Sequence, residues 1–221
     1  MSIKVTRLSN GLTVATDHMA SVETVSVGVY VDVGTRQEEA ETNGVAHILE
    51  HMAFKGTETR SCQQINSDAE QLGAEVNAHT DKDHTAFHMN GLAEHATDFI
   101  RMLGDIVRNG SFPEAELERE RQVILQEFDE DADDAVSAGF KLFDHLCFGE
   151  HTLARPVIGT RRNIERFKRD ELVDYVRRQS SASNIIVGVA GGVDLGLQRA
   201  EAFYVQKGLR RLALVQLREH G

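Results

Sequence analysis

The chain has 221 residues, of which 41% are hydrophobic and 27% are charged, and its formal net charge is -11 at pH 7. This length is enough to bury a hydrophobic core, either as one large domain or as two small ones. The negative charge argues against nucleic-acid binding, because a phosphate backbone is bound by a basic surface. A basic peptide would match such a surface better.

The sequence shows no sign of membrane insertion or export. No apolar run approaches the roughly 20 residues that cross a bilayer, and the N-terminal stretch MSIKVTRLSNGLTV lacks the hydrophobic core of a signal peptide. Cys62 and Cys147 are the only cysteines and lie far apart, so no disulfide framework is expected. We therefore expect a cytoplasmic protein with reduced thiols.

The first quarter of the chain is predicted to form strands and then a helix. Alternating apolar residues on both sides of Asn10-Gly11 predict a β-hairpin over residues 3–16. The β-branched run TVSVGVYVDVG, residues 24–34, predicts a central strand. Residues 35–43 are polar and predict a loop, and a helix is predicted from about Gly44 to Phe54.

Helices and strands are mixed in the remainder. Ser61 and Gln64 form a capping-box pair that opens a helix ending at Gly73. The further predicted elements are strands over about 74–80 and 84–90, helices over 92–108, from Pro113 onward, and over 135–148 and 168–179, a strand at NIIVGVAGG (184–192) and a helix over 195–206. Hairpins mixed with helices indicate a single α+β domain with a mostly antiparallel sheet.

The stretch GVAHILEHMAFKGT, residues 44–57, places two histidines and a glutamate on one side of the first predicted helix. His47 and His51 lie at i and i+4 and can both reach one metal ion, while Glu50 can reach a water on that ion. The opposite stripe is apolar and consists of Val45, Ile48, Leu49 and Met52. The polar side of any amphipathic helix also faces water, so this helix alone leaves both interpretations open.

The helix after Pro113 carries two carboxylates among its apolar residues. Glu120 and Glu127 lie within one ~100° arc of that helix. The apolar members of the arc are Leu117, Ile124 and Phe128. A carboxylate that points toward a core is costly unless it is paired, and a cation would pair with it. Glu127 is therefore a candidate third ligand and Glu120 a candidate supporting carboxylate; the alternative is a wide helix whose acids lie at the core margin.

With both helices considered, the sequence resembles the pitrilysin-type (M16) zinc peptidases, the inverted-zincin group that includes mitochondrial processing peptidase. The signature of that group is HxxEH followed by a distal glutamate. Here the motif at His47 to His51 is followed by Glu127, with the 75 residues 52–126 between them. Three further segments resemble the group: GAEVNAHTDKDHTAFH (73–88), ELERERQVILQEF (116–128) and RPVIGTRRNIERF (155–167).

The resemblance implies a role for each matched residue. His47, His51 and Glu127 would bind Zn²⁺. Glu50 would be the general base, and Glu120 would support the site. Asn77 and Ala78 would hold the backbone of the substrate. The implied activity is that of a zinc-dependent endopeptidase acting on unfolded or short peptides.

The resemblance also implies the fold and a partner. We expect an α+β fold with helices packed on one face of a mostly antiparallel sheet. Residues 1–221 would form a single domain, one N-terminal-type half of a clamshell, although the tail from about residue 205 matches the pattern of the group poorly. Members of the group are usually built from two halves, in one chain or two, and the second half supplies an Arg/Tyr pair. No residue here is assigned to that pair, and SSASN, residues 180–184, replaces the usual Tyr-x-Pro. We therefore expect a second M16-type half or subunit, the same or different.

Two other functions fit parts of the sequence. A non-catalytic structural subunit of a peptidase-like heteromer would share the fold, although such members typically have a degraded motif and this motif is intact. A lyase similar to the S-ribosylhomocysteinases would share the HxxEH helix, with Cys62 at a helix start as a reactive thiol. The helix that carries Glu127 fits the peptidase better.

Four other histidines and one acidic run are weaker candidates for a functional site. His84 and His88 share one face of a predicted strand at a separation of ~13 Å, which indicates surface or packing roles. If the tail is flexible, His145, Cys147 and His151 could form a second metal site, but ordinary packing is the favoured interpretation. The acidic run at residues 129–134 is expected to be a solvated helix end; the alternative is a surface that binds basic residues of a peptide.

Overall fold

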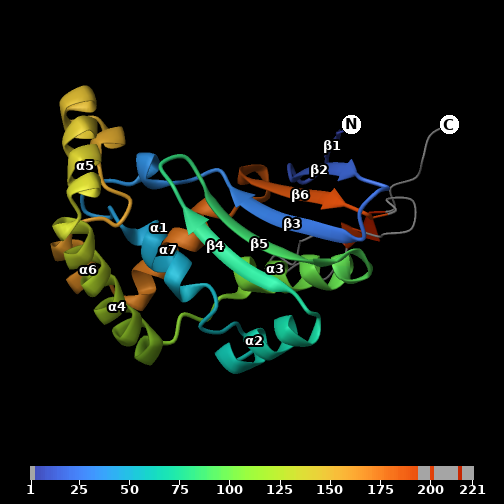
Figure 1. Ribbon diagram of the computed structural model, residues 1–221. Coiled ribbons are helices and arrows are strands. Elements are labelled where there is room, and N and C mark those ends of the chain that lie inside the picture. Colours follow the sequence, from blue (N-terminus) through green and yellow to red (C-terminus); the bar gives the residue numbers. More distant parts are fainter. Residues whose placement is uncertain (1–2, 194–199, 202–213, 216–221) are drawn as a thin grey trace.

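The structure is a computed structural model that describes residues 3–193, 200–201 and 214–215. It centres on a six-stranded sheet in the order β1-β2-β6-β3-β5-β4, whose pairs are antiparallel except for β2 with β6 (Figure 1). The strands are β1 (Lys4–Arg7), β2 (Thr13–His18), β3 (Thr24–Val31), β4 (Glu75–Thr80), β5 (Thr85–Leu92) and β6 (Ile185–Gly191). The expected α+β class and mostly antiparallel sheet are confirmed.

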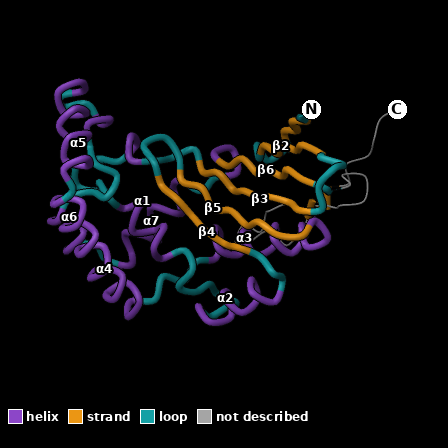
Figure 2. Tube along the Cα trace, in the orientation of Figure 1, coloured by secondary structure: helices purple, strands orange, loops and turns teal. Residues whose placement is uncertain are grey.

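Six of the described helices lie where the sequence predicts them, with small shifts at their ends, whereas the short helix Arg161–Arg166 falls in a segment for which no element was predicted. They are α1 (Val45–Met52), α2 (Cys62–Gln71), α3 (Ala96–Asn109), α4 (Glu114–Asp133), α5 (Ala135–Phe148), α6 (Arg161–Arg166) and α7 (Arg169–Gln179). The helix predicted over 92–108 begins as a separate 3₁₀ turn at Ala93–His95. In Figure 2 the strands form one layer, and α4, α5 and α6 lie at the end of the molecule beside β4.

One face of the sheet is covered by helices and the other is open. Along β3, four valines are buried while Ser26 and Tyr30 between them are exposed. The strands β3 and β5 pack against α3, whose Phe99 is fully buried. Alternation of this kind places alternate side chains on opposite faces, so the expectation of helices on one face is confirmed.

The predicted hairpin over residues 3–16 is also confirmed. The strands β1 and β2 pair antiparallel, and the main-chain N–H of Leu12 donates to the Asn10 side chain at 3.0 Å. Gly11 has φ of 94°, a left-handed conformation that glycine adopts without steric cost. The local turn chemistry was therefore sufficient to predict this element.

The loop between β3 and α1 contains a buried carboxylate. Glu38 is 2% exposed and accepts hydrogen bonds from the main-chain N–H groups of Gly44 (2.8 Å) and Ala46 (2.9 Å) and from the Asn43 side chain (3.0 Å). The first N–H groups of a helix have no partner within the helix. Burial raises the pKa of Glu38, and these hydrogen bonds oppose that shift. Glu38 therefore fixes where α1 begins.

Most of the last predicted helix lies outside the described residues. Of the helix predicted over 195–206, only Ala200–Glu201 lie within the described residues, and they form the short strand β7, which pairs with β8 (Leu214–Val215). The helix prediction is wrong at these two positions, because their main chains pair with Val215 and Leu214 of another strand. The other residues of that range, and most of the tail from about 205, lie outside the described residues, so the single domain over 1–221 stays a prediction.

Candidate metal centre

Three potential ligands meet where α1 packs against α4. His47 and His51 project from α1 and Glu127 from α4, and their ligand atoms all lie within 4.8 Å of one another. Glu127 Oε2 is 3.3 Å from His51 Nε2 and 3.8 Å from His47 Nε2. Within the described part of the chain, this is the only group of three such residues close enough to hold one ion.

A buried arginine holds α4 in position. Arg121 is 7% exposed and donates to the main-chain carbonyls of Ile164 and Phe167 at the end of α6. Its other partner is Glu118, one turn earlier on α4. A buried guanidinium needs such partners, so this contact orients the face of α4 that carries Glu127.

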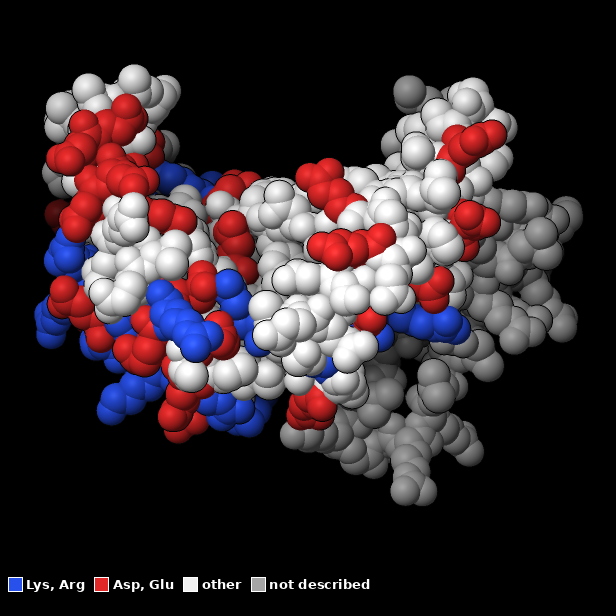
Figure 3. All heavy atoms as spheres, turned by 60° about the horizontal axis from the view of Figure 1, so that its bottom comes forward, with Lys and Arg blue, Asp and Glu red and all other residues white. Residues whose placement is uncertain are grey.

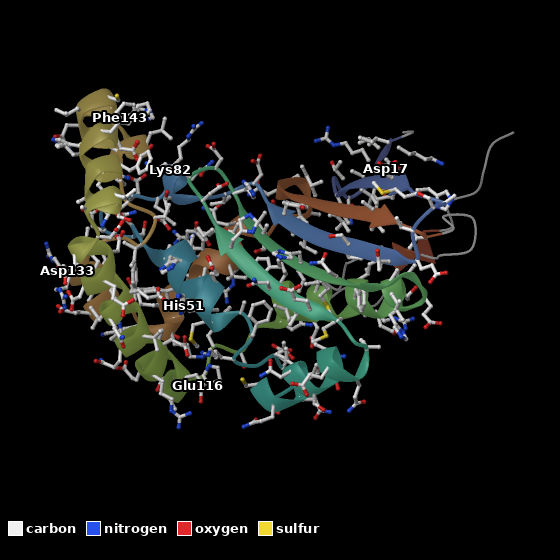
Figure 4. The ribbon with its side chains drawn as sticks, in the orientation of Figure 1. Asp17, His51, Lys82, Glu116, Asp133 and Phe143 are labelled. Carbon is white, nitrogen blue, oxygen red and sulfur yellow. The ribbon has the colours of Figure 1, made fainter. Side chains whose placement is uncertain are left out.

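A carboxylate behind His51 sets the orientation of its ring. His51 Nδ1 donates to Glu120 Oε2 at 3.1 Å, and Lys55 Nζ lies 2.6 Å from Glu120 Oε1. Figure 4 labels His51, which lies on α1 near α4. Burial acts to raise the pKa of Glu120, but the hydrogen bonds from Lys55 and His51 outweigh it and lower the pKa. The ionised carboxylate keeps the proton on Nδ1, so Nε2 presents its lone pair toward Glu127.

His47 is held in its neutral form. Burial, together with the neighbouring His51, lowers the pKa of His47 to about 4. The two rings lie 4.8 Å apart at 70°, and Nδ1 of His47 is buried without a hydrogen-bond partner. The only nitrogen of His47 with a polar neighbour is therefore Nε2, which faces Glu127.

This donor set fits a divalent metal ion. Two neutral imidazoles and a carboxylate are the ligands of a catalytic Zn²⁺ site that keeps a position open for water. Without a cation, the lone pair of His51 Nε2 would face the negative charge of Glu127 with no proton between them. A cation between these groups would remove the repulsion, so the three expected ligands are suited to bind a divalent metal ion.

Glu50 lies beside the ligands and faces a cleft. Burial raises its pKa, while hydrogen bonds from Thr80 and the nearby His51 and His79 lower it; the net shift is upward. It lines a cleft of about 400 Å³ together with His47. Glu50 does not belong to the converging group of ligands, and Thr80 is the hydrogen-bond partner of its carboxylate.

The cleft lies between β4 and α5. Its other wall includes Phe140 of α5 and the segment 156–158. Two ion pairs, Lys82 with Asp144 and Lys141 with Asp131, hold α5 to the β4–β5 turn and to α4. Figure 3 shows acidic and basic side chains interspersed on the side of the molecule that carries α4.

Asn77 and Ala78 lie on the edge strand. Because β4 is the last strand of the sheet, one of its sides is unpaired. Asn77 is exposed on the open face, and its Oδ1 accepts the main-chain N–H of Ala78 at 2.8 Å. An added peptide strand can pair with such an edge. For the Ala78 N–H to take part in that pairing, its hydrogen bond to the Asn77 side chain must first break.

The other candidates from the sequence do not join this site. Cys62 lines a separate hollow with Lys55 and residues 56–63. The described His145, Cys147 and His151 do not converge on one point. The acidic run is the end of α4, and Asp134 caps α5 by accepting the N–H of Ser137 at 2.7 Å.

Three contributors were missed by sequence reasoning. Lys55 forms an ion pair with Glu120, Thr80 forms a hydrogen bond with Glu50, and Glu38 accepts hydrogen bonds from main-chain N–H groups at the start of α1. The sequence contained one usable signal: Lys55 lies four residues after His51, so it falls on the same helical side. Thr80 and Glu38 reach the site only through tertiary packing.

The chain belongs to the insulinase family, peptidase family M16, whose pattern matches residues 13–161. It is 36% identical over 193 residues to an uncharacterized zinc protease of Rickettsia bellii, covering 87% of this chain and 47% of that protein. It is 39% identical over 191 residues to the mitochondrial-processing peptidase subunit beta of Neurospora crassa, covering 85% and 40%. The chain thus spans less than half the length of these relatives.

Solved structures share the fold. A protease from Helicobacter pylori superposes with a TM-score of 0.83 at 22% identity, covering 87% of this chain and 47% of that one. A peptidase M16 inactive domain from Pseudomonas fluorescens gives a TM-score of 0.81 at 18% identity, covering 88% and 47%. The described chain therefore has the fold of an M16 half. None of its described helices is both long and apolar enough to traverse a bilayer.

Proposed function

We propose that this chain is the metal-binding half of a zinc-dependent endopeptidase that cleaves unfolded or short peptides. The observation that carries the proposal is the convergence of His47, His51 and Glu127, contributed by two helices, beside Glu50, which lines the cleft and is not one of the three ligands. Membership of the M16 family and the similarity to zinc proteases support the same activity.

Each residue has a distinct task in this proposal. His47, His51 and Glu127 would hold the ion, which when bound polarises the scissile carbonyl and lowers the pKa of a water. Glu50 takes the proton of that water and passes it toward the leaving amine. Its raised pKa suits this task, because a general base is most effective when its pKa approaches the working pH.

The substrate would lie along β4. The unpaired edge at Asn77 and Ala78 can accept an extended backbone through main-chain hydrogen bonds, which tolerate varied sequences. An extended peptide pairs with such an edge more readily than a folded chain, whose own main-chain groups are already bonded. This supports unfolded or short peptides as substrates.

A second M16-type half would complete the site. The chain spans less than half of its relatives, and α5 has no buried residue. Val136, Phe140 and Phe143 on α5 are 65%, 65% and 59% exposed, and Phe140 also lines the cleft. Exposed apolar patches of this kind mark interaction surfaces. We propose that the second half covers this side of α5 and closes the cleft.

The alternative is a non-catalytic subunit, and one related fold is indeed described as an inactive domain. Substitution of Glu50 by Gln separates the two functions. In a zinc endopeptidase, Glu50→Gln retains the metal but loses turnover of a fluorogenic peptide by about 10²–10⁴-fold. Wild-type protein that binds zinc yet shows no turnover, alone or with each candidate second half, would establish the structural role instead.

A further inference from the structure

Three histidines gather on the open face of the sheet, around the β4–β5 hairpin. His79 pairs with Ala86 across the hairpin, so it stands diagonally between His84 and His88. The ring of His79 lies 5.4 Å from that of His84 and 5.9 Å from that of His88. The strand ladder fixes these positions, because the register of the hairpin sets which side chains are neighbours.

The pair formed by His79 and His84 has nearly the geometry of the pair at the candidate zinc centre. Their rings are 5.4 Å apart at 83°, compared with 4.8 Å and 70° for His47 and His51. Two imidazoles that bind one ion through nitrogens at ~2.1 Å have ring centres about 5 Å apart. Either pair can therefore share an ion with small rotations of its rings.

A carboxylate behind His84 orients its ring as for a metal ligand. Nδ1 of His84 lies 3.0 Å from Asp81 Oδ2, and Asp81 is itself fixed, since its Oδ1 accepts the main-chain N–H groups of Asp83 and His84 at 2.7 Å each. A carboxylate that receives the Nδ1 proton leaves Nε2 with its lone pair outward. The same arrangement holds His51 against Glu120 at the first centre.

We propose that His79 and His84 form a second binding site, for a divalent transition-metal ion such as Zn²⁺, Cu²⁺ or Ni²⁺. Imidazole nitrogens favour these ions over Ca²⁺ or Mg²⁺. Both side chains reach solvent, since His79 is exposed and His84 is one-third exposed, so water completes the coordination. His88 lies on the other side of His79 from His84, with its ring 5.9 Å from that of His79.

The position of the site gives it a consequence for catalysis. His79 also lines the cleft with His47 and Glu50. An ion bound between His79 and His84 would stand beside the edge of β4 and obstruct a peptide laid along that strand. Excess metal would then inhibit hydrolysis. This consequence rests on the proposed peptidase function, whereas binding of the second ion does not.

Equilibrium dialysis of the full chain against Ni²⁺ or Zn²⁺ tests the site directly. We expect two ions bound by the wild type, one by His79→Ala/His84→Ala, and one by His47→Ala/His51→Ala. The matched control is His95→Ala, whose side chain is 31% exposed compared with 33% for His84 and which should still bind two. Circular dichroism checks that each variant is folded.

A second measurement examines the supporting carboxylate. Asp81→Asn should weaken binding of the second ion about 10–100-fold while the first ion is held as before. The proposal is overturned if the wild type binds a single ion, or if His79→Ala/His84→Ala binds as many ions as the wild type. Both outcomes concern binding alone, so they leave the peptidase proposal to its own test.

Discussion

His51 has a carboxylate on each side of its ring, and the two differ in their surroundings. Glu120 is ionised by its contacts with Lys55 and His51, and it fixes the proton on Nδ1. Glu127 is partly exposed and faces the free Nε2. The resemblance implied these two roles, and the distances fit them: Glu120 contacts only one of the two rings, while Glu127 faces both.

Removal of the Glu120 charge tests its supporting role. Glu120→Gln should lower the affinity for Zn²⁺ about 10–100-fold, because His51 loses the partner that fixes its tautomer. Competition with a chromophoric chelator measures this change. Glu114→Gln, an exposed glutamate in the first turn of the same helix, is the control and should leave the affinity unaltered. Equal affinities for both variants would contradict the role assigned to Glu120.

Asp105 provides a prediction about pH and stability. Its side chain is 8% exposed; burial acts to raise its pKa, but hydrogen bonds from Asn109, Thr59, Thr57 and Arg60 outweigh burial and lower it. A carboxyl whose pKa is lower in the folded state stabilises the fold at neutral pH, and this contribution is lost as the pH falls below about 4.

Urea unfolding at several pH values measures that contribution. We expect the free energy of unfolding to fall as the pH drops from about 5 toward 3, and Asp105→Asn to be less stable at pH 7 with a shallower acid slope. Asp98, an exposed aspartate on the same helix, supplies the control Asp98→Asn. An acid slope that is the same in Asp105→Asn and wild type would refute the linkage.

At the scale of elements, the N-terminus of α1 is held by Glu38 and the preceding loop. The carboxylate satisfies the N–H groups of Gly44 and Ala46, and Asn163 donates to the carbonyls of Ala40 and Asn43. The helix has only eight residues, so its stability depends on such tertiary contacts. The placement of both histidines follows from this anchoring.

Glu38→Gln should therefore destabilise the protein by about 1–3 kcal/mol, because an amide replaces a buried acceptor and one donor loses its partner. Thermal unfolding followed by circular dichroism measures the change. Glu39→Gln, the exposed neighbour, is the matched control and should remain within about 0.5 kcal/mol of wild type. If both variants unfold alike, the capping role is wrong.

The elements that the sequence predicts well are those whose structure is determined by residues close together in the sequence. Asn10-Gly11 predicted the first hairpin, and the 3.6-residue periods of α1, α3 and α4 predicted helices, since turn chemistry and helical faces are set by near neighbours. Glu38 was placed in a plain loop, because its partners are main-chain N–H groups that no side-chain pattern reveals. His79 was overlooked beside His84, since only the strand register brings them together.

At the scale of the whole molecule, α5 stands out from one end, next to α4 (Figure 1). Leu146 on α5 is 75% exposed, and Phe143 is 59% exposed. An isolated half would leave this apolar surface in water, whereas a second M16-type half would cover it. The chain covers 47% of the Rickettsia bellii protein, which leaves room for such a half.

Charged substitutions on α5 test this surface. Phe143→Glu should weaken assembly with a second M16-type half by at least tenfold and leave the stability of the isolated chain nearly unchanged, because the side chain is already exposed. Analytical ultracentrifugation measures assembly, and Arg101→Glu, a 54%-exposed residue on α3, is the control. Assembly that tolerates Phe143→Glu as well as Arg101→Glu would place the interface elsewhere.

The most direct test of the metal centre is X-ray diffraction from zinc-loaded crystals at wavelengths on either side of the zinc absorption edge. We predict an anomalous peak within about 2.2 Å of His47 Nε2, His51 Nε2 and a Glu127 carboxylate oxygen, with Glu50 outside the ligand set. A well-ordered molecule with no peak there, or with Glu127 turned away from it, would contradict the account.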